Sequence, residues 1–192
     1  LAAAGASGVL IGSGLIDGRL AYAYAQDPSV MGGAVGKAQA EKILRLLAMA
    51  RQAGAPVFAL CDSAGARLNE GAAAMNAYAE IAAQTARLRG RVPVIALVFG
   101  RCVGGAALCA QLSDFVLMRE GASLYMAGPA VVSAATGAAV TAEQLGGAAA
   151  CLAAGACHKV APDDGSLCAA ARELLAFLPD NSRRRAPVDL SE

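Results

Sequence analysis

Short apolar runs alternate along the chain with segments whose apolar residues recur at helical spacing. The clearest runs are 57–60 and 94–99, continuous and bounded by Pro or Gly, as in strands buried on both faces of a sheet. The segments before them end near residues 53 and 88 and gather their apolar residues on one side. This order predicts an α/β fold with a mostly parallel sheet and right-handed crossovers.

The helical stripes and the shorter elements complete this prediction. The first stripe comprises Ala40, Ile43, Leu44, Leu47 and Ala50, and the second Met75, Tyr78, Ile81, Ala82, Thr85 and Leu88. At the N-terminus, β-prone segments at 9–16 and 20–26 flank Asp17-Gly18, a strong hairpin-turn signal. Further strands are expected at 115–118, 124–126 and 158–160, and helices after Gly128-Pro129, near 142–154 and at 166–177.

The C-terminal composition suggests where the domain ends. From residue 179 the sequence is polar and lacks periodicity, as in a linker. We therefore expect one domain at 1–178 and a linker at 179–192.

Composition narrows the class of protein. The 192 residues are 57% hydrophobic and 16% charged, which is enough for one sizeable core. A net charge of +1 argues against nucleic-acid partners. The longest apolar stretch, 92–112, is broken by Arg101 and two glycines, so no membrane span is expected. Six cysteines without a C-x-x-C pair favour reduced thiols in the cytoplasm over a metal site.

Two loops are candidates for the functional site because ligands of α/β folds bind beyond the carboxyl ends of the strands. They are 62–71 and 100–106. Gly104 and Gly105 would let a carbonyl oxygen approach backbone amides at the start of a helix, which is the arrangement of an oxyanion hole. Tight packing of the helix on the sheet explains the same glycine pair equally well.

Several familiar sites are absent from the sequence. Gly12-Ser13-Gly14 is followed by a hairpin turn rather than a helix, and no Gly-Lys-Ser/Thr phosphate loop occurs. No Gly-x-Ser-x-Gly elbow accompanies His158, which is the only histidine. We expect His158 to be a hydrogen-bonded structural residue.

A series of ordered motifs covers nearly the whole chain. These are GSGLIDGR at 12–19, QD at 26–27, MGG at 31–33, AEKI at 40–43, DSAGARLNEG at 62–71, GGA at 104–106, SDF at 113–115, GP at 128–129, TG at 136–137, EQLGG at 143–147 and GACH at 155–158. In them the chain resembles the N-terminal half of beta-type carboxyltransferase subunits of biotin-dependent acyl-CoA carboxylases and decarboxylases. Members of that family include the beta chain of propionyl-CoA carboxylase and the alpha chains of methylmalonyl-CoA and glutaconyl-CoA decarboxylases.

The resemblance implies a crotonase-like fold, the β-β-α spiral of the ClpP/crotonase superfamily, with coenzyme A lying along this half. Gly104 and Gly105 match the oxyanion glycines of the family. The positions that match its substrate-binding residues are Ser63, Ala64, Gly65, Ala66, Arg67, Cys102 and Val103. Ala64 replaces a usual glycine, and Arg101-Cys102 replaces the commoner Pro-Cys, so both loops depart locally from the family pattern.

The activity implied is the transfer of a carboxyl group between biotin and the α-carbon of an acyl-CoA through a stabilised enolate. No side-chain acid or base is demanded. Biotin would be attached to a partner carrier domain and held mainly by a second crotonase-like half. The implied partners are that half, a biotin carboxyl carrier protein, and biotin carboxylase or membrane subunits of a decarboxylase, in an oligomer.

Two other functions remain open at this point. A crotonase-like hydratase or isomerase would need a carboxylate facing the thioester, for which Glu70 and Glu80 are the candidates. A non-catalytic assembly subunit would keep the fold alone.

Overall fold

The computed structural model describes residues 8–187 and is built on one mixed sheet. Its strands run in the order β1-β2-β3-β4-β5-β7, and β6 pairs with the end of β4. Only β1 and β2 are antiparallel among the pairs described. The strands are β1 (Val9–Ile16), β2 (Arg19–Gln26), β3 (Val57–Ser63), β4 (Val94–Val103), β5 (Phe115–Arg119), β6 (Ser123–Tyr125) and β7 (Lys159–Ala161). The predicted α/β class and the opening hairpin are confirmed.

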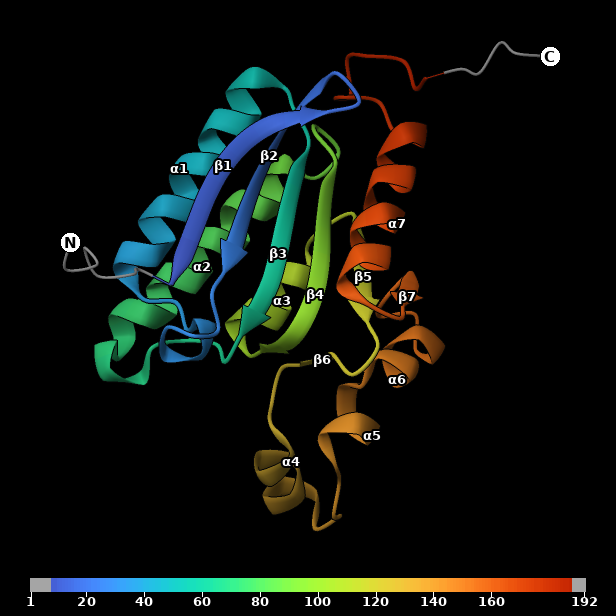
Figure 1. Cartoon of the computed structure of the whole chain (residues 1–192). Helices are drawn as coiled ribbons and strands as arrows, with labels where there is room; N and C mark the ends of the chain where they lie inside the picture. Colours follow the sequence, from blue (N-terminus) through green and yellow to red (C-terminus); the bar gives the residue numbers. More distant parts are fainter. Residues whose placement is uncertain (1–7, 188–192) are drawn as a thin grey trace.

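Helices cover both faces of this sheet, which creates two apolar layers. The helices are α1 (Lys37–Ala53), α2 (Ala72–Leu88), α3 (Gly105–Gln111), α4 (Pro129–Thr136), α5 (Ala142–Gly146), α6 (Ala148–Ala153) and α7 (Asp164–Phe177). One core lies between the sheet and α1, α2 and α3, and a smaller one lies beneath α7. Figure 1 shows α4 and α5 projecting beyond the rim at which β3 ends.

The helical stripes were predicted with two errors. On α1, Ile43 and Leu47 are buried as expected, but Leu46 is buried where Leu44 is only half-buried. On α2, Tyr78 is buried, whereas Met75 is exposed near the start of the helix. At the N-terminal end of α2, the apolar residue Met75 is therefore outside the core and near the rim of the sheet.

The end of β4 is a correction to the sequence-based prediction. Residues 100–103 were expected in a loop, but β4 continues through Val103 and pairs there with β6. The register against β3 shifts at this point, because Cys61 pairs with Val98 whereas Ser63 pairs with Cys102. The sequence Gly-Arg-Cys does not reveal this extension, since its partner strand lies more than twenty residues further on.

Asp62 fills the irregularity that the register shift creates. Its carboxylate accepts a hydrogen bond of 3.1 Å from the backbone N–H of Arg101, and a Cβ at Gly100 would overlap it. Burial raises the pKa of the Asp62 carboxyl, although the hydrogen bond and the charge of Arg101 oppose the rise. Glycine at position 100 therefore leaves room for the Asp62 carboxylate in this arrangement.

The polar segment after α7 stays in contact with the domain. The Arg19 guanidinium binds the Asp180 carboxylate and the carbonyl oxygens of Leu175 and Leu178, each at 2.7 Å. Further along, the N–H of Ser182 donates to the carbonyl of Arg91 at 2.9 Å. The first residues of the expected linker are therefore attached to the domain. Residues 188–192 lie outside the described part of the chain. The domain boundary at residue 178 stays a prediction.

No helix within residues 8–187 is long and apolar enough to cross a membrane. The same part of the chain contains no group of three or more His, Cys, Asp or Glu residues placed to hold a metal ion. The six cysteines are free thiols, and five of them are buried.

We expect Arg19→Lys to lower the free energy of unfolding by about 1–3 kcal/mol, because lysine keeps the charge but cannot make the three hydrogen bonds of the guanidinium. Chemical denaturation measures the change. The control is Arg172→Lys on the exposed side of α7, where the structure records no partner for the side chain. Equal losses in the two variants would contradict this account of how the C-terminal segment is attached.

Candidate functional site

A cavity of about 790 Å³ lies at the carboxyl ends of β3 and β4. Its size falls within the usual range for sites of small ligands. The lining residues are Met31, Ala34, Ala64, Gly65, Ala66, Arg67, Leu68, Asn69, Met75, Tyr78, Ala79, Gly104, Gly105, Leu108 and Met126. The two loops singled out in the sequence therefore form walls of one cavity, and most of its remaining wall is apolar.

The first loop is held in place by backbone hydrogen bonds to the segment around residue 33. The N–H of Ala64 donates to the carbonyl of Gly32, and the N–H of Val35 donates to that of Gly65, both at 2.9 Å. Gly65 has a φ of +98°, and a Cβ there would lie 3.0 Å from the carbonyl oxygen of Val103, the last residue of β4. Both its backbone angle and this close approach favour glycine at position 65.

Tyr78 connects the two loops from below. Its hydroxyl lies 3.2 Å from the Ser63 Oγ and 3.2 Å from the carbonyl oxygen of Gly65. The Ser63 hydroxyl in turn donates to the Gly33 carbonyl at 2.8 Å and accepts from the N–H of Gly65 at 3.1 Å. Burial raises the pKa of Tyr78 well above its usual range, so the phenol stays protonated and remains a donor.

The second loop turns at Gly104 and starts α3 at Gly105. Gly104 has a φ of +61°, and its N–H donates to the carbonyl of Tyr125 at 3.0 Å. The Gly104 amide is therefore hydrogen-bonded to β6, and the catalytic role of the two glycines stays a prediction. The N–H of Gly105 opens α3, where helix geometry provides no intrahelical acceptor.

Gly105 packs directly against the ring of Tyr78. A Cβ at this position would overlap the ring carbons, and the backbone of Gly105 has no positive φ. Glycine is therefore required here by space rather than by conformation. From the sequence, Tyr78 was assigned only to the apolar stripe of α2. Its hydroxyl group, unusual in that alanine-rich stripe, was the one sign that Tyr78 also makes hydrogen bonds.

Three of the expected substrate-binding residues do not line the cavity. Ser63 and Cys102 are fully buried beneath it, each 0% exposed, and Val103 contributes its carbonyl behind Gly65. A hydrogen bond with Cys61 raises the pKa of the Cys102 thiol, and burial adds to the rise. Cys102 is consequently a packing residue in the thiol form.

No carboxylate or imidazole is among the lining residues. Glu70 accepts a hydrogen bond of 2.8 Å from the N–H of Lys37 at the start of α1, and Glu80 is exposed on the side of α2 that faces α1. His158 accepts from the N–H of Val116 at 3.1 Å, which confirms its expected structural role. The cavity thus has mostly apolar walls and Gly105 at the start of α3, with Arg67 and Tyr78 as its titratable side chains.

Comparison with known proteins assigns relatives to the chain. A family model described as carboxyl transferase domain matches residues 2–191. Methylmalonyl-CoA decarboxylase subunit alpha of Veillonella parvula is 41% identical over 183 residues, which cover 94% of this chain and 36% of that protein. The 12S subunit of methylmalonyl-CoA carboxyltransferase from Propionibacterium freudenreichii subsp. shermanii is 40% identical and covers 94% and 35%. The chain thus spans about a third of the length of these curated relatives.

Solved structures agree with this assignment. The crystal structure of transcarboxylase 12S with methylmalonyl-CoA and methylmalonic acid bound matches 95% of this chain and 36% of its own, with a TM-score of 0.93 and 38% identity. The Pseudomonas malonate decarboxylase MdcD-MdcE hetero-dimer matches 89% of this chain and 77% of its own, with a TM-score of 0.81 and 28% identity. The expected crotonase-like fold is confirmed.

We expect Gly105→Ala to destabilise the fold by about 1–3 kcal/mol, because the added methyl group must displace the Tyr78 ring. Urea denaturation measures the change. Gly14→Ala in β1 is the control, since a Cβ there meets nothing within 4 Å.

A double-mutant cycle attributes the cost to the ring. In a Tyr78→Ala background the space above Gly105 opens, so Gly105→Ala should become nearly neutral. The same loss in both backgrounds would show that something other than Tyr78 excludes a side chain at position 105.

Proposed function

Because the chain belongs to the family of carboxyl transferase domains, we propose that it is the acyl-CoA-binding half of a biotin-dependent carboxyltransferase. The single observation that carries the proposal is the cavity lined by Gly105, whose amide starts α3, and by no carboxylate or imidazole. Such a wall suits the stabilisation of a negative charge on oxygen and leaves no side chain to serve as a base.

Gly105 is the donor in this proposal. A thioester carbonyl lying against it would receive a hydrogen bond that strengthens as charge develops on the oxygen, and one such donor is commonly worth about 3–4 kcal/mol. Gly104 contributes the turn that presents Gly105. Residues 64–67 line the facing wall and would hold the coenzyme A thioester beside it.

The reaction moves a carboxyl group between two atoms. When carboxylation is the net direction, the bond between the carboxyl carbon and biotin N1 breaks as a bond to the α-carbon of the acyl-CoA forms, and decarboxylation reverses the exchange at the α-carbon. In either direction the α-carbon carries the electron pair as an enolate, whose oxygen Gly105 would stabilise. Biotin on a partner carrier domain supplies or receives the carboxyl group.

The substrate class follows from the relatives and the cavity wall. The relatives are named for methylmalonyl-CoA and propionyl-CoA, and we propose a short acyl-CoA of this kind as the substrate of the present chain. Met75, Leu108 and Met126 give the wall an apolar character suited to a short acyl group and to the coenzyme A arm. A hydratase or isomerase is not favoured, because Glu70 caps α1 and Glu80 lies outside the cavity.

The remaining machinery would come from partners. We propose a second crotonase-like half joined through or beyond the linker at 179–192, a biotin carboxyl carrier protein, and biotin carboxylase or decarboxylase subunits, in the cytoplasm. Exposed apolar side chains at the cavity rim support a covering partner. They are Leu68, Met75, Leu108 and Met126.

We predict that Gly105→Pro lowers turnover in the assembled enzyme by about 10²-fold or more relative to Gly105→Ala. Both variants add atoms against Tyr78, but only proline removes the amide hydrogen. A transcarboxylation assay measures turnover, and circular dichroism verifies that both variants are folded. Equal turnover in the two would rule out the Gly105 amide as the oxyanion donor.

We also predict that the purified chain is inactive alone and associates with itself or with its second half, because the apolar rim is exposed. Light scattering reports the association, and the assay is run with and without the second half. A strictly monomeric chain that transfers carboxyl groups from biotin unaided would contradict the proposed division of the site between two halves.

A further inference from the structure

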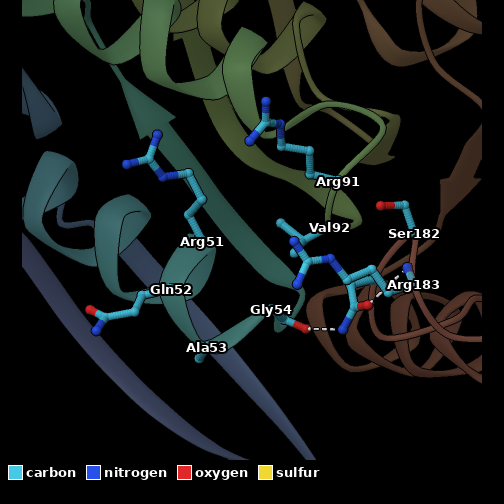
Figure 2. Close-up of a pocket in the computed structure, with 9 residues that line it drawn as sticks. Arg51, Gln52, Ala53, Gly54, Arg91, Val92, Ser182 and Arg183 are labelled. Carbon is cyan, nitrogen blue, oxygen red and sulfur yellow. Dashed lines mark hydrogen bonds between the residues drawn. The ribbon is translucent and has the colours of Figure 1, made fainter.

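A second cavity, of about 590 Å³, lies at the amino ends of β3 and β4, opposite the rim that bears Gly105. It shares no lining residue with the first cavity. Its lining residues are Arg51, Gln52, Ala53, Gly54, Arg91, Val92, Asn181, Ser182 and Arg183. Figure 2 shows the side chains of Arg51, Arg91 and Arg183 around this opening.

The three arginines come from distant parts of the sequence and are brought together by a specific attachment. Arg51 is in the last turn of α1, Arg91 lies between α2 and β4, and Arg183 follows α7. Asn181 fixes the C-terminal segment to the domain, because its Nδ2 donates to the carbonyl of Gly54 at 2.7 Å and its Oδ1 accepts from the N–H of Arg183 at 3.0 Å. With the bond from Ser182 to Arg91, this makes the cavity a defined part of the fold.

The positive charge of the cavity is not balanced by the residues around it. None of the nine lining residues is acidic, and within residues 8–187 no ion pair is recorded for the three arginines. The carboxylates nearby in sequence have other partners, since Asp180 binds Arg19 at 2.7 Å and Asp114 lies 3.7 Å from Arg89.

The helix dipole does not account for the cluster. A basic residue in the last turn of a helix is favourable by itself, which explains Arg51. Arg91 and Arg183 lie outside helices, so the helix dipole gives no reason for their place at the same cavity.

We propose that this cavity binds a small phosphate-bearing molecule through Arg51, Arg91 and Arg183. Guanidinium groups match phosphate oxygens in geometry and stay charged at all physiological pH values. The side chain of Ser182 adds a hydroxyl at the same edge. A concave opening of this volume suits a small molecule rather than the flat surface of a protein.

Pyrophosphate is the probe, and isothermal titration calorimetry on the purified protein measures its binding. We expect Arg51→Gln and Arg91→Gln each to weaken binding about tenfold or more, because each removes charge-assisted hydrogen bonds. Arg45→Gln, on an exposed position of the same helix outside the cavity, is the matched control and should leave the affinity unchanged. Added sodium chloride should weaken binding, and sulfate at equal ionic strength should bind less tightly than pyrophosphate.

Any one of four results would overturn the proposal. The first three are no binding of pyrophosphate at millimolar concentration, an equal loss of affinity in Arg45→Gln, and binding of sulfate as tight as that of pyrophosphate. Displacement of pyrophosphate by coenzyme A together with full binding in Arg51→Gln would place the anion in the other cavity, and would equally overturn it. Arg183→Gln, in a segment without regular structure, repeats the test without touching a helix or strand.

Discussion

The buried contact between Tyr78 and its neighbours is the constraint on which the functional rim depends. The phenol hydroxyl reaches Ser63 and Gly65 of the first loop, while its ring supports Gly105 at the start of the second loop. A single rigid side chain therefore sets the separation of two loops that are some forty residues apart in the sequence. Because buried polar groups are costly unless they are hydrogen-bonded, the junction has one favourable arrangement. Preorganised amides require such a fixed frame.

An irregularity in the sheet completes that frame. Extra residues in β4 opposite Asp62 allow β4 to extend to Val103, where β6 pairs with it and accepts the Gly104 amide at Tyr125. With the Gly104 amide bonded to β6, the Gly105 amide at the start of α3 is the one that the proposed function uses. Irregularities of this kind are common in strands next to binding or active sites, where they change the direction of a group.

The sequence predicts the parts of this structure that depend on local pattern. Continuous apolar runs identified β3 and β4, and Asp17-Gly18 identified the hairpin. The engagement of the Gly104 amide could not be predicted, because it depends on a strand more than twenty residues away. Tyr78 was assigned to the core by its spacing, which is correct for its ring but does not indicate where its hydroxyl points. The order of strands and helices in the sequence predicted the two loops that line the cavity. The hydrogen bond from the Gly104 amide to Tyr125 depends on a long-range contact, so the sequence did not predict it.

The two rims of the sheet differ in chemistry, and the difference has a physical origin. At the carboxyl ends of β3 and β4, glycines and alanines leave the backbone accessible, so the site is made of amides and apolar walls. At the amino ends, the ends of α1 and α2 and the attached C-terminal segment contribute arginines. A net charge of +1 conceals this separation, because acidic side chains elsewhere balance the total without approaching the cluster. In the proposed function, a backbone amide of this cavity would stabilise an enolate, and the electrophile would come from outside the cavity walls. The open, apolar rim of the cavity is the face across which we propose that the electrophile arrives.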